Sequence, residues 1–432
     1  MSTLKTMIEK AKIAREATLK LAALKNEVKN KALVAIAAAI KKNSGRIIGA
    51  NEKDVTESKK AKISDVLIKR LLIDGDKISE IIEEIESVAK LDDPNGKILS
   101  QVELDRGLML YQETCPIGVI GAIFESRPDA LVQIAALCIK SGNAVILKGG
   151  SEAKNSNRIL VEIISDACEK NGIPKGAVQL IETRDEVSEM LKMNDFISMI
   201  IPRGSNNFVK YVQQNTSIPV LGHSDGICHV FIDESAEMKK ALNIAYDAKC
   251  QYPAVCNAME TLIVHKNIAK KFLPEIAKKY AGSKVEVRGD EETGKILKGI
   301  KKATELDWKT EYNDLVLSIK IVNNLSDAVS HINKYGSKHT EAIVTENKKN
   351  AEEFMDLVDA ASVMWNASTR FADGFRYGKG AEVGISTSKI HARGPVGLEG
   401  LVIYKYKLVG HGQIVGDYSG KNAKKFLHKK IK

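Results

Sequence analysis

The fold class follows from two apolar runs, Ile117-Gly-Val-Ile-Gly-Ala-Ile-Phe124 and Ala144-Val-Ile-Leu-Lys148. Both have the length and composition of buried strands, and residues 130–140 between them indicate a helix that ends at Gly142-Asn143. Strand–helix–strand units of this length predict a parallel sheet covered by helices. The alternation continues with strands at 178–181 and 197–201 and helices at 187–191 and from Ser205.

A second unit with the same alternation begins near residue 225, so the sequence predicts an α/β fold with two sheets. The N-terminal region differs, because Leu33, Ile36 and Ile40 recur there at helical spacing. Residues 401–407 alternate like an exposed strand, and the lysine-rich end, residues 421–432, indicates a solvated or frayed tail. The second unit's expected strands are 228–233, 261–265, 317–322 and 342–345, and its expected helices are 237–249, 267–280, 326–335 and 349–358.

Composition narrows the class of protein. The 432 residues are 44% hydrophobic and 28% charged, as in an ordinary globular protein, with a formal net charge of +10. The longest apolar run, Ala32 to Ile40, is too short to span a membrane, and the N-terminus lacks the apolar core of a signal peptide. We therefore expect a cytoplasmic protein without a membrane partner. The lysines are scattered and aromatic residues are only 5%, which argues against nucleic acid and leaves a solvated surface or the gathering of anionic substrates.

Two glycine-containing loops are candidate phosphate sites. Lys148-Gly-Gly-Ser-Glu152 and Pro202-Arg-Gly-Ser205 each follow an expected strand and open a helix. Ligands of parallel sheets bind at the carboxyl ends of the strands, where helix N-termini present N–H groups to phosphates. The Gly-x-Gly-x-x-Gly fingerprint is absent, so both loops can equally be plain strand-to-helix turns.

Cys256 is the candidate nucleophile, because it follows a proline-containing loop and precedes a strand. A half-buried structural cysteine is the alternative. Six cysteines are too few for a disulfide framework and fit a reducing compartment. We expect no metal site, since the spacing of Cys228, His229, Cys250 and Cys256 matches no ligand pattern. The remaining histidines of interest are His223, on a glycine-flanked loop, and three that can equally be structural: His331, His339 and His391.

Several motifs resemble the γ-glutamyl phosphate reductases (glutamate-5-semialdehyde dehydrogenases), a branch of the aldehyde dehydrogenase superfamily. The resemblance covers most of the chain, and residues 322–343 resemble this branch rather than the superfamily. The motifs are Cys115-Pro-Ile-Gly-Val-Ile-Gly-Ala-Ile-Phe-Glu-Ser-Arg-Pro128, Ile200-Ile-Pro-Arg-Gly204, Gly222-His-Ser-Asp-Gly-Ile-Cys-His229, Val255-Cys-Asn-Ala-Met-Glu-Thr261, Glu382-Val-Gly-Ile-Ser-Thr387 and His391-Ala-Arg-Gly-Pro-Val-Gly-Leu-Glu-Gly400.

The resemblance implies NADPH-dependent reduction of L-glutamyl 5-phosphate to L-glutamate 5-semialdehyde with release of phosphate, the second step of proline biosynthesis from glutamate. Cys256 matches the position of the nucleophile, whose thiolate forms a thioester that hydride then reduces. Backbone N–H groups, such as that of Cys256, or the side chain of Asn257 beside it are the expected oxyanion donors. The resemblance implies cofactor contacts at Lys148, Gly149, Ser151, Gly204, Ser205 and Glu382, and we hypothesise substrate contacts at Arg127, His223, Ser386, Thr387 and Arg393.

Two departures separate the chain from hydrolytic aldehyde dehydrogenases. His223 stands where those enzymes place a glutamate base, and Glu125-Ser-Arg127 stands near their asparagine oxyanion donor. Loss of the glutamate removes the obvious activator of water, which agrees with acyl phosphate chemistry. An ordinary aldehyde dehydrogenase is the first rival, and a nucleic-acid-binding protein exploiting the positive charge is the second.

The family's architecture implies an aldehyde-dehydrogenase-like fold of two doubly wound α/β domains and a small β oligomerisation arm. Residues 1–103 and 121–225 would form the NADPH-binding domain and residues 226–395 the catalytic domain. Residues 104–120 and 396–432 would form the arm and the C-terminal tail. We expect a homodimer or tetramer, with glutamate 5-kinase as a transient partner.

Overall fold

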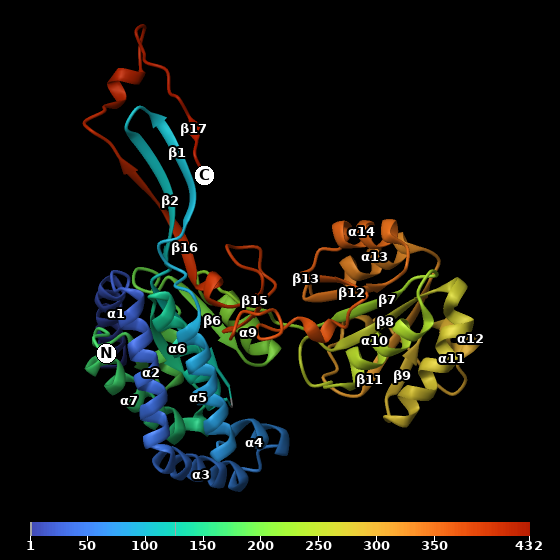
Figure 1. Cartoon of the computed structure of the whole chain (residues 1–432). Helices are drawn as coiled ribbons and strands as arrows, with labels where there is room; N and C mark the ends of the chain where they lie inside the picture. The colour runs from blue at the N-terminus through green and yellow to red at the C-terminus, as the bar shows by residue number, and fades with distance from the viewer. Residues whose placement is uncertain (1, 126) are drawn as a thin grey trace. The chain divides into compact units, whose positions relative to one another are not determined.

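The computed structural model describes residues 2–125 and 127–432 and divides the chain into two compact units (Figure 1). The first unit comprises Met1–Leu221, Lys379–Gly384 and Val396–Lys432. The second comprises Gly222–Gly378 and Ile385–Pro395. No helix among the described residues is long and apolar enough to span a membrane.

The first unit contains a four-stranded parallel sheet in the order β5-β4-β3-β6. This confirms the predicted alternation of strands and helices. Helix α6 begins at Pro128 and ends before Gly142, whose φ of +80° lies in the left-handed region that favours glycine. The strands are β3 (Val119–Phe124), β4 (Ala144–Lys148), β5 (Val178–Leu180) and β6 (Met199–Arg203), and the helices are α6 (Pro128–Ser141), α7 (Lys154–Lys170), α8 (Arg184–Met190) and α9 (Asn206–Gln214).

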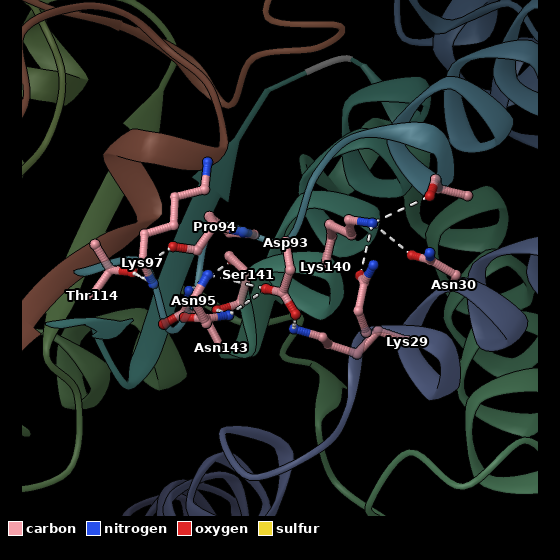
Figure 2. A network of polar contacts seen from close by, with 12 residues as sticks. Lys29, Asn30, Asp93, Pro94, Asn95, Lys97, Thr114, Lys140, Ser141 and Asn143 are labelled. Carbon is pink, nitrogen blue, oxygen red and sulfur yellow. Dashed lines mark hydrogen bonds and ion pairs between the residues drawn. The ribbon is translucent and has the colours of Figure 1, made fainter. Parts of the chain in front are cut away.

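The N-terminal helices belong to this first unit, and a buried polar network joins them to it. Figure 2 shows Lys140 of α6, whose fully buried ammonium donates to Asn26 Oδ1 at 3.0 Å, Asn30 Oδ1 at 2.6 Å and the carbonyl of Ala89 at 3.2 Å. Burial lowers the pKa of Lys140. Because the acceptors come from α2 and α5, the lysine ties these two helices to α6. The N-terminal helices are α1 (Ser2–Leu21), α2 (Asn26–Lys42), α3 (Ser44–Lys60), α4 (Asp65–Leu71) and α5 (Gly75–Lys90).

The second unit is built on a seven-stranded parallel sheet in the order β10-β9-β11-β8-β7-β12-β13. Its long strands and helices confirm the expected pattern, whereas the sequence analysis missed the short elements β9, β10, α12 and β13. The strands are β7 (Cys228–Ile232), β8 (Met259–His265), β9 (Glu286–Gly289), β10 (Lys301–Lys302), β11 (Val316–Val322), β12 (Thr340–Val344) and β13 (Ser362–Trp365). The helices are α10 (Met238–Cys250), α11 (Lys266–Gly282), α12 (Glu291–Ile296), α13 (Leu325–Tyr335) and α14 (Lys348–Leu357).

A separate antiparallel sheet, here called the arm sheet, has the order β16-β2-β1-β17. A hairpin forms from β1 (Ile98–Asp105) and β2 (Leu108–Pro116), and the expected exposed strand is β16 (Val402–Val409). The prediction of a frayed tail was wrong at its end, since β17 (Lys429–Lys430) pairs with Val102 and Glu103. The pairing is a backbone contact, which a lysine-rich composition cannot reveal.

The predicted domain boundaries differ from the observed units in three places. The first break falls after Leu221 instead of residue 225, and Lys379–Gly384 belongs to the first unit although the sequence placed it in the catalytic segment 226–395. Strand β1 begins at Ile98, so residues 98–103 belong to the arm sheet instead of the helical region. The remaining two strands, β14 (Gly384–Ser386) and β15 (Gly394–Val396), pair with each other.

Candidate active site

The loop that carries Cys256 packs against the backbone of a second loop, residues 222–226. A Cβ added at Gly226 would lie 2.3 Å from the carbonyl oxygen of Cys256 and 2.5 Å from its Cα. Only glycine leaves room for so close an approach. The thiol of Cys228, at the start of β7, donates a hydrogen bond to the same carbonyl oxygen at 3.2 Å. The main chain of Cys256 is therefore held from two sides, while the side chain is partly exposed.

Three side chains gather at one edge of the second sheet. His223, Cys256 and His339 precede β7, β8 and β12, which are neighbouring parallel strands, so their amino ends share an edge. One nitrogen from each ring and the Cys256 sulfur lie within 4.8 Å of one another. We call this set the His–Cys–His cluster. It lies at the amino ends of its strands, opposite to the carboxyl ends at which the sequence analysis looked for ligands.

The hydrogen bonds of the two histidines define what each ring can do. Nδ1 of His223 lies 2.7 Å from the carbonyl of Ile385, so it carries a proton and leaves Nε2 with a lone pair. His339 is fully buried, its Nδ1 lies 2.9 Å from Thr340 Oγ1, and its Nε2 has no partner within the described residues. Imidazoles beside a thiol can stabilise the thiolate or accept its proton.

The three buried cysteines, Cys138 on α6, Cys168 on α7 and Cys228 on β7, are poor nucleophile candidates. Burial raises the pKa of the Cys168 thiol to about 12 and also raises the pKa values of the Cys138 and Cys228 thiols well above their ordinary value. These thiols stay protonated near neutral pH, and burial denies them to a substrate. Cys256 therefore remains the better candidate.

The remaining residues expected in the catalytic unit lie in the second unit with Cys256. Asn257 is buried and its Nδ2 donates to the carbonyl of Ala372 at 2.8 Å, which commits one of its two amide hydrogens. The backbone N–H of Thr387 donates to the carbonyl of Gly222 at 3.4 Å. Together with the bond from His223 to Ile385, this places the segment carrying Ser386 and Thr387 beside the His223 loop.

Arg393 belongs to a cationic group around one carboxylate. Its Nη2 lies 3.0 Å from Asp359 Oδ1, and Lys389 and Lys338 approach the same carboxylate at 2.9 and 3.3 Å. Hydrogen bonds from Lys389, Arg393 and Lys338 hold the pKa of Asp359 well below its ordinary value, although burial opposes them. Three cations around one anion leave a net positive site within the second unit.

In the first unit the two expected phosphate loops flank a carboxylate. Glu125 follows β3, between β4, which ends at Lys148, and β6, which precedes Ser205. Its Oε2 accepts from the backbone N–H of Ser205 at 2.9 Å, at the N-terminus of α9. Burial lowers the pKa of Lys148, which the carboxylates of Glu152 and Glu125 oppose. The position proposed for a cofactor phosphate thus holds a side-chain anion in this structure.

The glycines of these loops have local packing reasons. A Cβ at Gly149 would lie 2.1 Å from Asn157 Nδ2, and one at Gly204 would lie 2.6 Å from Glu125 Oε2. Neither position therefore needs a phosphate to explain its glycine. Ser151 is exposed and begins a single 3-10 turn, residues 151–153.

Arg127, a hypothesised substrate contact, lies in the first unit, apart in sequence from the catalytic segment. Its Nη2 lies 3.2 Å from Asp129 Oδ2. Burial lowers the pKa of Arg127, but the carboxylates of Asp129, Glu84 and Glu382 outweigh it and raise the pKa. Glu382, on the returning segment Lys379–Gly384, is likewise in the first unit. The centre of the Glu125-Ser-Arg127 segment, Ser126, lies outside the described residues.

The predicted residues divide cleanly between the units. Those expected to bind the cofactor all lie in the first unit, and those expected for catalysis and substrate lie in the second, except Arg127. Sequence reasoning missed the positions of His339 and Gly226. A histidine just before a strand carries no local signal, since its approach to Cys256 depends on β12 pairing beside β7.

The chain, with its two α/β units and the partly exposed Cys256, can be compared with known proteins. The sequence profile described as the aldehyde dehydrogenase family matches residues 2–295, and the chain belongs to that family. A γ-glutamyl phosphate reductase of Acetivibrio thermocellus is 57% identical over 96% of both chains, and one of Methanococcoides burtonii is 53% identical over 98% of this chain and 96% of its own. The crystal structure of a γ-glutamyl phosphate reductase from Thermotoga maritima superposes with a TM-score of 0.93 at 43% identity, covering 94% of this chain and 99% of that one.

Within the family, these identities place the chain among the γ-glutamyl phosphate reductases, which are oxidoreductases. The resemblance stated from the motifs is thereby confirmed, as is the α/β aldehyde-dehydrogenase-like fold.

Proposed function

We propose that the chain reduces L-glutamyl 5-phosphate to L-glutamate 5-semialdehyde with NADPH and releases phosphate, as the second step of proline biosynthesis in the cytoplasm. The observation that carries the proposal is the thiol of Cys256, which is partly exposed, lies beside two imidazoles and belongs to a main chain held in place by its neighbours. The chain is also related to γ-glutamyl phosphate reductases. Sulfur suits this chemistry because one atom serves first as nucleophile and then as leaving group.

The first step uses Cys256. Its thiolate attacks the acyl carbon of the substrate, the carbon–oxygen bond to phosphate breaks, and phosphate leaves with the bonding electrons. NADPH, when bound, supplies hydride to the resulting thioester. The carbon–sulfur bond then breaks, which restores the Cys256 thiolate and frees the aldehyde. His223 and His339 are the groups placed to take the thiol proton before attack.

The charge of the second unit fits an anionic substrate. Arg393, Lys338 and Lys389 surround Asp359 and exceed it in charge. Such a net positive group attracts an acyl phosphate that also carries a carboxylate. We assign Arg393 to phosphate or carboxylate binding, with Ser386 and Thr387 as neutral donors and Asn257 as the oxyanion donor.

The first unit offers partial support for NADPH. Lys148, at the carboxyl end of β4, is a half-buried cation of the kind that meets a cofactor phosphate, with Gly149 and Ser151 in the loop beyond it. The N–H groups at Gly204 and Ser205 fit a pyrophosphate, provided that the Glu125 carboxylate turns away. Glu382 would bind the nicotinamide ribose.

The reaction class can be tested in reverse. Purified protein is mixed with glutamate semialdehyde and NADP⁺, with and without inorganic phosphate, and NADPH is followed by absorbance. We expect growth of absorbance only with phosphate. Growth without phosphate would mean that water accepts the acyl group, with His223 as its base, and would identify a hydrolytic aldehyde dehydrogenase.

The covalent step needs a matched pair of variants. Cys256→Ser should lower turnover by at least about 10³-fold, because a serine hydroxyl is a far weaker nucleophile near neutral pH. Cys250→Ser is the control, since Cys250 is also partly exposed but lies at the end of α10. Near-parent turnover in Cys256→Ser would exclude the thioester.

The arm sheet supports a proposal of self-association. β16 is its edge strand, and five large hydrophobic side chains on it are exposed: Ile403, Tyr404, Tyr406, Leu408 and Val409. An exposed apolar edge strand invites pairing with another chain. We propose a homodimer or tetramer built on this edge, with glutamate 5-kinase as a transient partner. Sedimentation at the monomer mass over a wide concentration range would contradict the oligomer.

A further inference from the structure

The His–Cys–His cluster has the composition of a metal site. His223, Cys256 and His339 each offer one ligand atom, and the three atoms lie within 4.8 Å of one another. All three residues belong to the second unit, so their separation does not depend on the placement of the first. Thiolate sulfur and imidazole nitrogen are the ligands that Zn²⁺ prefers.

The hydrogen bonds within the described part of the chain leave one ring nitrogen of His339 without a partner. His339 is fully buried, yet its Nε2 has no partner in the described part of the chain. A buried nitrogen without a partner costs free energy unless something binds it. An imidazole can bind a metal ion through either nitrogen, so His339 is available as a ligand.

His223 shows the hydrogen bond that usually supports a metal-binding histidine. Its Nδ1–H donates to the carbonyl of Ile385 at 2.7 Å, which fixes the tautomer and leaves Nε2 as an acceptor. Histidines that bind metal ions almost always donate their second N–H to a carbonyl or carboxylate in this way. The hydrogen bond therefore orients the ring so that Nε2 is the atom available to a metal ion.

The distances suit a tetrahedral ion after a small movement. Three atoms no more than 4.8 Å apart lie within about 2.8 Å of a common point, against about 2.0–2.1 Å for Zn–N and 2.3 Å for Zn–S. Each ligand atom must move inward by about 0.5–0.8 Å. His223 and Cys256 are partly exposed on loops and can supply most of this movement by side-chain rotation.

We propose that His223, Cys256 and His339 form a reversible Zn²⁺ site whose occupation inhibits the enzyme. On binding, the Cys256 S–H gives its proton to solvent as the zinc–sulfur bond forms, both imidazoles stay neutral, and water fills the fourth position. Coordination lowers the nucleophilicity of the sulfur, and the bound ion blocks the approach of the substrate to it. Inhibition rests on the proposed role of Cys256 as nucleophile, whereas the binding of zinc does not.

Binding is tested directly on the full chain without an affinity tag and under a thiol-free reductant. Co²⁺ replaces Zn²⁺ as a spectroscopic probe, because a thiolate ligand gives an intense sulfur-to-cobalt charge-transfer band. We expect one Co²⁺ per chain with this band, displaced by one equivalent of Zn²⁺. Absence of the charge-transfer band would overturn the site. Binding of more than one equivalent of Co²⁺ without this band would also overturn it.

Variants test the ligand set. Cys256→Ser should abolish the charge-transfer band, and His339→Gln should weaken Zn²⁺ binding by more than the about 10–100-fold that loss of an outer-shell partner costs. Matched controls are Cys250→Ser and His411→Gln, the latter an exposed histidine of the first unit. Parent affinity in His339→Gln would show that His339 is no ligand.

A test without variants covers the case in which His339→Gln does not fold. One equivalent of Zn²⁺ should slow the alkylation of Cys256 by iodoacetamide at least about tenfold, with recovery after a chelator. The alkylation of Cys250 serves as the internal control by mass spectrometry. Unchanged alkylation of Cys256 would overturn the proposal. If the binding signals are present but the reductase assay is negative, the proposed function fails while the zinc site stands.

Discussion

Gly226→Ala is the substitution that tests how the Cys256 main chain is held. The added methyl would lie 2.3 Å from the Cys256 carbonyl oxygen, 2.5 Å from its Cα and 2.7 Å from its Cβ. Cβ contacts under 3.0 Å essentially never occur, so the two loops must separate by at least about 0.7 Å. The backbone at Gly226 is not in the left-handed region, so steric contact alone is tested.

The expected magnitude follows from that displacement. Overpacking of this kind costs about 1–3 kcal/mol of unfolding free energy. A nucleophile misplaced by nearly an ångström lowers turnover by up to about 10²-fold. We therefore expect a folded protein, a modest loss of stability and a large loss of kcat, with KM for the cofactor unchanged because the cofactor residues lie in the first unit.

The assay measures kcat, the rate of Cys256 alkylation by iodoacetamide, and urea unfolding on the same preparations. Gly294→Ala is the matched control, since its Cβ would meet nothing within 4 Å and the residue lies in a helix of the same unit. The control should keep parent activity and gain up to about 1 kcal/mol of stability. Parent kcat and parent alkylation rate in Gly226→Ala would refute the reasoning.

Three further predictions concern the first unit. Lys140→Met should lower the unfolding free energy by about 1–3 kcal/mol, because it leaves the buried carbonyl of Ala89 and two partly buried asparagine oxygens without this donor. Exposed Lys42→Met should change it little, and urea unfolding measures both. Glu125→Gln should tighten NADPH about two- to fivefold by removing a charge from the N-terminus of α9, and unchanged or weaker binding by fluorescence titration would place the pyrophosphate elsewhere. Burial would raise the pKa of Glu186, but two backbone N–H groups and an ammonium lower it to about 2. That stabilisation, on the order of 1 kcal/mol once solvent screening is counted, is present above pH 4.5 and lost as the pH falls toward 2. Glu186→Gln should therefore flatten the acid side of the stability profile, and parallel profiles would count against it.

The sequence alone determined which segments are strands and helices. Apolar runs such as 117–124 and 144–148 indicate buried strands directly. The spacing and type of apolar residues in a segment reflect which of its side chains are removed from water on folding. The sequence also determined the identity of Cys256 as a candidate nucleophile, since the family motif around it is contiguous. Short strands such as β9 and β13 escaped prediction, because four residues are too few to show a period.

Only the tertiary structure decided which residues meet. Cys256 and His339 are separated by most of the second sheet along the chain, and they approach because β8, β7 and β12 are neighbours with their amino ends at one edge. Gly226 must be glycine because the backbone of Cys256, in another loop, packs against it. Glu382 belongs to the first unit because the chain returns to that unit at residues 379–384. The order of strands in a sheet, and the return of the chain to an earlier unit, are set by how whole helices and strands pack together. A local pattern of residue types predicts neither.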